Sequence, residues 1–167
     1  NDVLKNENGA PYVGVFYLNI ESGANGFGHA AMMLLRSDDT GDLYSYVGDN
    51  SNKFTAVLWG YNNANVNYAY GVDVGSVVNN TMEDGVYGFR VKIRDSKEYI
   101  DKYNRVIYFP IADDSGKSIA AAAKETILNT NGDGYDRKDY KLFLNNCDQN
   151  ARRWIQAGGI TIDTEGH

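Results

Sequence analysis

The stretch His29-Ala30-Ala31-Met32-Met33-Leu34-Leu35 is a nearly continuous apolar run, and it decides the fold. Such a run is typical of a strand that is buried on both faces at the centre of a sheet. The turn Ser37-Asp38-Asp39-Thr40-Gly41 follows it, and a second strand-like segment, Leu43 to Val47, comes directly after the turn. The sequence therefore predicts an antiparallel hairpin at the centre of a sheet.

Other β-branched and aromatic runs predict further strands on either side of this hairpin. These segments are Tyr12 to Leu18, Phe54 to Gly60, Val86 to Ile93 and Val106 to Phe109. Between the second and third of them, Tyr61 to Tyr70 is rich in Asn and Tyr and follows no period, so we expect a loop there.

Three segments of the second half predict helices. Ser96 to Tyr103 forms a short one, and Ser118 begins a longer one with an alanine run after the loop Pro110 to Gly116. The longer helix should end at the breaker Asn131-Gly132-Asp133-Gly134.

The final helix is expected over about Asp148 to Ala157, with Gly158-Gly159 as its C-cap. Helical spacing predicts that Trp154 and Ile155 are buried and that Arg152 and Arg153 are exposed. No internal repeat or linker interrupts the chain, so residues 1–167 are expected to form one α+β domain with an antiparallel sheet packed against helices.

Composition excludes several classes of function. A chain of 167 residues and 18.5 kDa fits one domain. Its net charge of −6 and its lack of Lys/Arg-rich runs argue against a nucleic-acid partner. No apolar run approaches the roughly 20 residues of a membrane span, so membrane insertion is not expected.

The location of the protein is expected to be extracellular or at the cell surface. The single cysteine cannot form an internal disulfide, so the fold does not need an oxidising compartment. The segment Asn1 to Gly9 is polar and lacks the apolar core of a signal peptide, which fits a mature product or an excised domain. Abundant Asn and Gly together with 13 tyrosines favour an exported origin.

The only cysteine, Cys147, directly precedes the predicted final helix, and His29 opens the central strand. A thiol at a helix start gains thiolate character from the helix dipole, and a neutral imidazole can accept its proton. A lone cysteine is otherwise often an inert core residue. The polar neighbours of this one, including Asn146 and Asp148, favour a nucleophile. The other histidine, His167, is the last residue and is not a candidate.

The order of these motifs resembles a known superfamily. The motifs are Gly28-His29-Ala30, the Tyr44-Ser45-Tyr46 strand, Tyr140 through Asn146-Cys147, Ala151 and Gly158-Gly159-Ile160. They resemble the circularly permuted papain-like superfamily related to NlpC/P60, whose bacterial members often occur as domains of secreted or Rhs-type toxin proteins. In ordinary papain-like enzymes the cysteine helix precedes the histidine strand, whereas here the order is reversed, as permutation would produce.

The resemblance implies a papain-like fold with a catalytic cysteine at the N-terminus of the last helix. It also implies hydrolysis of a peptide, isopeptide or cell-wall amide bond, with a peptide or peptidoglycan-like substrate. Cys147 would be the nucleophile and His29 the base, and we predict that their sulfur and imidazole nitrogen lie within about 4 Å. The alternatives are a cysteine acyltransferase and an inactive binding or adaptor domain on the same fold.

The resemblance also implies a third, polar residue on the strand after the histidine strand, where it would orient the imidazole. Ser45 is the first choice for this role, and Tyr46 and Asp49 are its alternatives. The oxyanion would be held by the N–H of Cys147, and Tyr140 is a candidate second donor. Asn146 and Tyr46 are further candidates for contacts with the oxyanion or substrate.

No metal or cofactor is expected. Gly116-Lys117-Ser118 resembles the end of a phosphate-binding loop, but Ile111 occupies the position of the required earlier glycine. The run Asn129 to Gly134 resembles a calcium loop, but Tyr140 stands where a bidentate glutamate is needed. One cysteine and one well-placed histidine also cannot build a typical structural zinc site.

Overall fold

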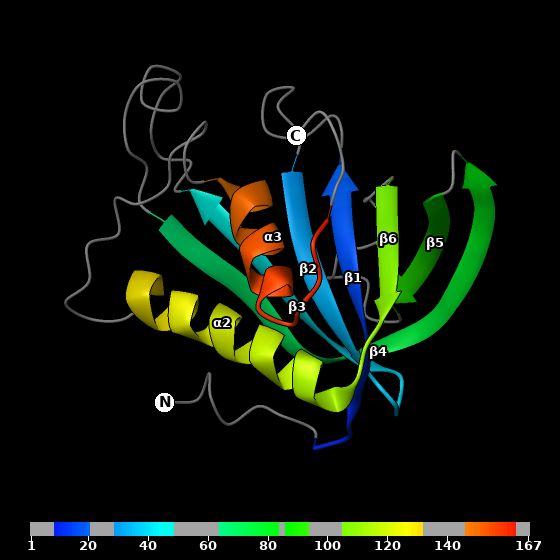
Figure 1. Ribbon diagram of the computed structural model, residues 1–167, viewed down its shortest axis with the longest axis horizontal. Helices are drawn as coiled ribbons and strands as arrows, with labels where there is room; N and C mark the ends of the chain where they lie inside the picture. Colours follow the sequence, from blue (N-terminus) through cyan, green and yellow to red (C-terminus); the bar gives the residue numbers. More distant parts are fainter. Residues whose placement is uncertain are drawn as a thin grey trace.

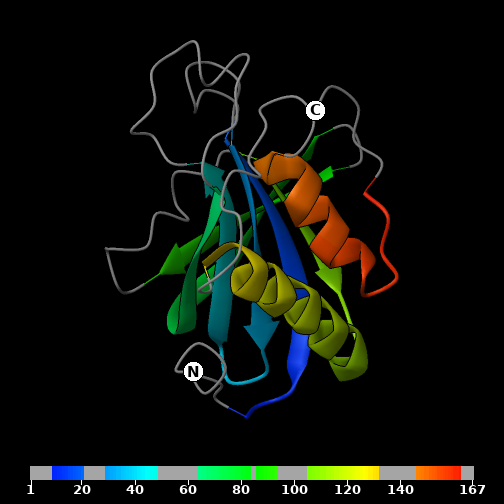
Figure 2. The same cartoon turned by 90° about the vertical axis from the view of Figure 1, so that its left-hand side faces the viewer.

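A computed structural model describes residues 9–20, 29–48, 64–83, 86–93, 105–131 and 146–162. In chain order these form β1 (Tyr12–Ile20), β2 (His29–Arg36), β3 (Thr40–Gly48), β4 (Ala64–Glu83), β5 (Val86–Ile93), β6 (Arg105–Pro110), α2 (Asp113–Asn131) and α3 (Cys147–Gln156). The strands form one antiparallel sheet in the order β5-β4-β3-β2-β1-β6. Both helices lie against the same face of this sheet (Figures 1 and 2). The α+β class expected from the sequence is therefore confirmed.

The central hairpin is also confirmed. β2 pairs with β3 from Leu35↔Gly41 to Met32↔Tyr44, and on its other side it pairs with β1. Every residue of β2 after His29 is buried, as its continuous apolar sequence requires.

Alternation along β2 divides the core into two apolar clusters. Ala30, Met32 and Leu34 belong to a first cluster, which also contains Trp154 and Ile155 of α3. Ala31, Met33 and Leu35 belong to a second cluster on the opposite face of the sheet. In Figure 1 the long strand β4 curves away and brings β5 near β6 behind this second face.

One strand was not expected from the sequence. The loop expected over residues 61–70 is wrong from Ala64 onward, because β4 begins there and pairs with β3 through Tyr46↔Val66 and Tyr44↔Tyr68. Val66 and Val72 are buried whereas Asn67 and Tyr68 are exposed, so the apolar positions keep no strict alternation. Pairing with β3 holds β4 in the sheet, although the sequence of β4 alone does not indicate a strand. The expected strand Phe54 to Gly60 and helix Ser96 to Tyr103 lie outside the described residues.

α2 begins earlier than expected. The loop expected over Pro110 to Gly116 is wrong from Asp113 onward, because the helix starts at that residue. The Asp113 carboxylate accepts a hydrogen bond from the Tyr12 N–H at 2.9 Å, and two acidic residues occupy the first turn, where the helix dipole favours them. Gly116 fits inside the helix because a Cβ there would overlap the Tyr12 side chain. The helix ends at Asn131, as the breaker predicts.

α3 is anchored by Trp154. The side chains of Trp154 and Ile155 are 1% and 0% exposed and Arg153 is exposed, which confirms those three predictions. The indole Nε1–H of Trp154 donates to Thr126 Oγ1 of α2 at 2.9 Å. The Trp154 ring also contacts the rings of Tyr44 and Tyr46 on β3. In the part of the chain that is described, neither helix has the length and apolar character needed to cross a membrane.

Candidate active site

The first turn of α3 holds Cys147 in a fixed position. Asn146 is the N-cap, and its side-chain oxygen accepts a hydrogen bond from the Gln149 N–H at 2.9 Å. In return the Gln149 side chain accepts from the Asn146 N–H at 3.0 Å, which completes a capping box. The Asn146 side-chain oxygen, a candidate for substrate contact, is therefore used in capping the helix.

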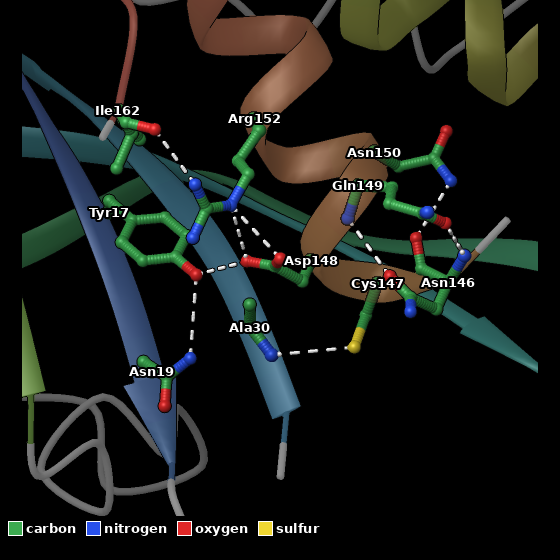
Figure 3. A network of polar contacts seen from close by, with 10 residues as sticks. All are labelled: Tyr17, Asn19, Ala30, Asn146, Cys147, Asp148, Gln149, Asn150, Arg152 and Ile162. Carbon is green, nitrogen blue, oxygen red and sulfur yellow. Dashed lines mark hydrogen bonds and ion pairs between the residues drawn. The ribbon is translucent and has the colours of Figure 1, made fainter. Parts of the chain in front are cut away.

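The Cys147 sulfur faces the start of β2. The Ala30 N–H donates to Sγ with a nitrogen-to-sulfur distance of 3.5 Å (Figure 3). Ala30 lies beyond Met32↔Tyr44, the last paired position of β2 and β3, so its N–H can point to the sulfur. A backbone donor and the positive end of a helix both favour the thiolate over the thiol. Cys147 is only 6% exposed.

His29 is the residue directly before Ala30. Its Nε2 lies 2.7 Å from Ser45 Oγ, so the orienting partner expected from the sequence does meet the imidazole. Burial lowers the pKa of His29, so the ring is neutral at physiological pH and able to accept a proton. Because Nε2 is at Ser45, a thiol that uses this ring as its base would have to meet Nδ1. The predicted distance of about 4 Å between this ring and the sulfur stays a prediction.

Ser45 and the sulfur approach the start of β2 from different sides. Tyr44 and Tyr46 flank Ser45 on β3, and both pack against Trp154 on the helix face. Alternation along a strand therefore directs Ser45 to the opposite face. Cys147 belongs to α3, on the helix face. Thiol and imidazole can meet only where β2 and β3 are no longer paired, beyond Met32↔Tyr44.

The remaining sequence candidates have different outcomes. Tyr46 is 1% exposed and lies in the first cluster, so it packs the core under α3. Tyr140, the candidate oxyanion donor, and Asp49, an alternative to Ser45, lie outside the described residues.

A polar network beside the thiol was not foreseen. Tyr17 on β1 donates its hydroxyl hydrogen to Asp148, the residue after Cys147 (Figure 3). The Arg152 Nε–H contacts both Asp148 oxygens, at 3.0 and 2.9 Å, and Nη1–H donates to the Ile162 carbonyl at 2.8 Å. Burial and the bond to Asp148 raise the pKa of Tyr17, which keeps its hydroxyl protonated.

The exposure predicted for Arg152 is wrong. Its side chain is 23% exposed because the guanidinium turns back onto Asp148 and lies over the Tyr17 ring. Spacing of four residues between Asp148 and Arg152 is a signal that could have indicated this ion pair. The contribution of Tyr17 could not be found this way, since it comes from a strand 131 positions away.

A pocket in the described part of the chain lies elsewhere. It has a volume of about 340 Å³ and lies between the first turns of α2 and the start of β1, with Tyr12, Arg36, Asp113, Lys117 and Lys124 among its lining residues. Neither Cys147 nor His29 lines it. We place the candidate site at Cys147 because a thiol and an imidazole come from neighbouring elements there. The pocket offers volume but contains neither group. Among the described residues, no group of His, Cys, Asp and Glu side chains could hold a metal ion.

Comparisons with known proteins give no relative. The chain matches no protein-family model, no curated protein and no solved structure.

Proposed function

We propose that this protein is a thiol-dependent hydrolase that cleaves a peptide, isopeptide or cell-wall amide bond through Cys147 and His29. One observation carries the proposal: the sulfur lies at the capped N-terminus of α3 and accepts the N–H of Ala30, the residue next to an imidazole bonded to Ser45. These contacts support the proposal that a nucleophile, a base and a group that orients the base act together at the start of β2.

In the proposed reaction His29 accepts the thiol proton and Cys147 Sγ attacks the carbonyl carbon of the amide. The negative charge on the carbonyl oxygen is stabilised by N–H groups at the start of α3. His29 then returns the proton to the leaving amine, the carbon–nitrogen bond breaks and a thioester remains. Water, deprotonated by His29, hydrolyses the thioester and regenerates the thiol. With an amine or lipid hydroxyl as acceptor, the same steps describe an acyltransferase.

The finer assignments belong to the same proposal. A papain-like fold of permuted order is supported by a histidine strand that precedes the cysteine helix in the chain. A peptide or peptidoglycan-like substrate, a secreted or surface location and an origin in a bacterial toxin protein rest on the resemblance of the motifs alone.

The second candidate is a binding or adaptor domain that retains the fold without catalysis. Two observations favour it: Cys147 is only 6% exposed, and Ser45 points to the face of β3 opposite Trp154. Both candidates predict the same fold, so reactivity of the thiol must distinguish them.

The test is the pH dependence of alkylation by iodoacetamide. Cys147 is the only cysteine, so all labelling of the native protein reports on it. The hydrolase predicts a rate that rises with a midpoint well below the ordinary thiol pKa of about 8.5. His29→Ala should move that midpoint upward, because the imidazole that accepts the thiol proton has been removed. A midpoint at or above about 8.5 in both proteins would identify the inactive domain.

Ser45→Ala tests the orienting role. With any substrate that the wild type turns over, this variant should lose less activity than Cys147→Ala, because a neutral hydroxyl orients the ring without supplying charge. Equal losses in two folded variants would place Ser45 in the chemistry. No loss would reassign the role to a backbone carbonyl or another side chain.

A further inference from the structure

An acidic side chain lies next to the thiol, where its charge opposes ionisation. Asp148 directly follows Cys147 in the first turn of α3. A carboxylate and a thiolate at neighbouring positions repel each other and compete for the positive end of the same helix. The side chain of Asp148 is 15% exposed, so solvent screens its charge only in part. Ionisation of the thiol therefore requires that the charge of this carboxylate be balanced.

Two side chains balance the carboxylate. Arg152, one turn further along α3, directs its Nε–H at both Asp148 oxygens, at 3.0 and 2.9 Å. Tyr17 from β1 donates its hydroxyl hydrogen to Asp148 Oδ1. Burial raises the pKa of Tyr17, so this hydrogen stays in place at neutral and mildly alkaline pH. Figure 3 shows the three side chains meeting beside Cys147.

The guanidinium of Arg152 is held in place by further contacts. Its Nη1–H donates to the Ile162 carbonyl at 2.8 Å, and its central carbon lies 5.5 Å from the centre of the Tyr17 ring. The side chain is 23% exposed, whereas an isolated ion pair at the surface leaves both side chains in water and contributes little. The positive charge is thus a fixed part of the surroundings of the thiol.

Other titratable groups near α3 are uncharged, exposed to solvent or turned toward the pocket. His29 on β2 is neutral because burial lowers its pKa, and Tyr46 on β3 packs in the first cluster. On α2, Lys124 lines the pocket and Glu125 is exposed, and Arg153 on α3 is exposed as well. All of these groups are unchanged in the variants below, so differences between variants report on the pair beside the thiol.

We propose that Arg152 and Tyr17 are positioning residues of the thiol site, which neutralise Asp148 and so lower the pH at which Cys147 ionises. The inference rests on the proposed function, in which the Cys147 thiolate is the nucleophile, and adds the groups that control its formation. Asp148 keeps its favourable place at the helix start while its charge is cancelled for the thiol. Removal of either charge alone must then move the ionisation of Cys147, in opposite directions.

The single cysteine allows a direct measurement of this ionisation. Protein that carries carbon-13 only at the cysteine Cβ gives one nuclear magnetic resonance signal. The chemical shift of that signal follows ionisation of Cys147 whether or not the thiol reacts with any reagent. A titration between about pH 6 and 10 gives a midpoint for each variant, and circular dichroism confirms that each variant is folded.

The two single-charge variants carry the test. Arg152→Gln leaves the carboxylate unbalanced and should raise the midpoint by roughly 0.5 to 1 pH unit, as expected for one partly screened charge several ångströms away. Asp148→Asn leaves the guanidinium unbalanced and should lower the midpoint by a similar amount. Arg152→Lys keeps the charge and should stay close to the wild type. Tyr17→Phe removes a hydrogen bond but no charge, so it should raise the midpoint by less than Arg152→Gln.

A purely structural role predicts a different pattern. Arg152→Gln and Asp148→Asn break the same ion pair, so a pair that only held the start of α3 in place would raise the midpoint in both. The double variant carries neither charge and should return to the wild-type midpoint, which keeps the test decisive if one single variant does not fold. Lys117→Gln is the matched control, because it breaks a pair of the same spacing on α2 and should leave the midpoint unchanged.

The outcomes separate this inference from the proposed function. Midpoints that move in the same direction in both single variants, or do not move, overturn the inference, and a wild-type midpoint below about 8.5 then leaves the hydrolase standing. A wild-type midpoint at or above about 8.5 with opposite shifts removes the hydrolase and retains the neutralisation of Asp148. A thiol that stays protonated throughout the titration overturns both.

Discussion

At the scale of single residues, His29 couples the proposed chemistry to stability. Burial lowers its pKa in the folded protein, so the unfolded chain, with an ordinary value of about 6.5, binds the proton first as the pH falls. The stability associated with a neutral His29 is complete above pH about 6.5 and is lost as the pH falls from there to the folded pKa.

We therefore expect the free energy of unfolding to decrease between pH 7.5 and 5, measured by urea denaturation. His29→Gln, which cannot titrate, should show a flatter dependence over this range. The carboxylates of Asp38 and Asp113 have lowered pKa values and titrate below this window. A variant with the same slope as the wild type would show that another group is responsible.

A second prediction concerns the buried ion pair of Arg36 and Asp42. Both side chains are almost fully buried, at 1% and 0% exposure, and Asp42 also accepts from the Gly71 N–H at 3.0 Å. Asp42→Asn leaves a buried guanidinium without its counter-charge and should cost about 3 to 5 kcal/mol of unfolding free energy. The matched control is Lys117→Ala, which breaks a more exposed pair with Asp113 and should cost at most about 1 kcal/mol. Equal costs in urea denaturation would contradict the argument.

At the scale of elements, the capping box is expected to support both α3 and the thiol. Asn146→Ala removes the bond to Gln149 N–H and should lower stability by about 1 kcal/mol. It should also raise the pH midpoint of Cys147 alkylation, because a frayed first turn no longer holds the sulfur at the positive end of the helix dipole. Asn146→Ser, which keeps a cap acceptor, should restore both quantities. Restored stability without restored reactivity would show that Asn146 has a further role at the site.

A substitution at Gly116 tests whether close packing against Tyr12 limits the first turns of α2. Alanine has the higher helix propensity by about 1 kcal/mol, yet a Cβ at this position would overlap Tyr12. We expect Gly116→Ala to lower the urea midpoint, since overpacking typically costs about 1 to 3 kcal/mol. Ala121→Gly, on the exposed side of the same helix, should cost about 1 kcal/mol from propensity alone. A stabilised Gly116→Ala would mean that Tyr12 moves away without penalty.

At the scale of the whole molecule, the first cluster joins β1, β2, β3, β4, α2 and α3 around Trp154. We expect one cooperative unfolding transition, because removing any of these elements exposes the same core. Fluorescence of Trp154, recorded after replacing the other tryptophan by Phe, should follow the same urea curve as far-ultraviolet circular dichroism. Separate midpoints for the two signals would show that the sheet and the helices unfold independently.

The sequence by itself determined the elements whose signals are local. The apolar run of β2, the turn after it and the alanine run of α2 predict structure from neighbouring residues alone. The position of Cys147 at a helix start, and the burial of Trp154 and Ile155, likewise follow from helical spacing.

Tertiary structure alone decided what depends on distant partners. β4 is a strand because β3 pairs with it, although its Asn- and Tyr-rich sequence has no period of its own. α2 extends back to Asp113 because Tyr12, 101 positions earlier, donates to its carboxylate. Arg152 is drawn inward by Asp148 and by the ring of Tyr17. A local pattern reports propensity and amphipathicity, whereas these contacts join residues that only the folded sheet and helices bring together.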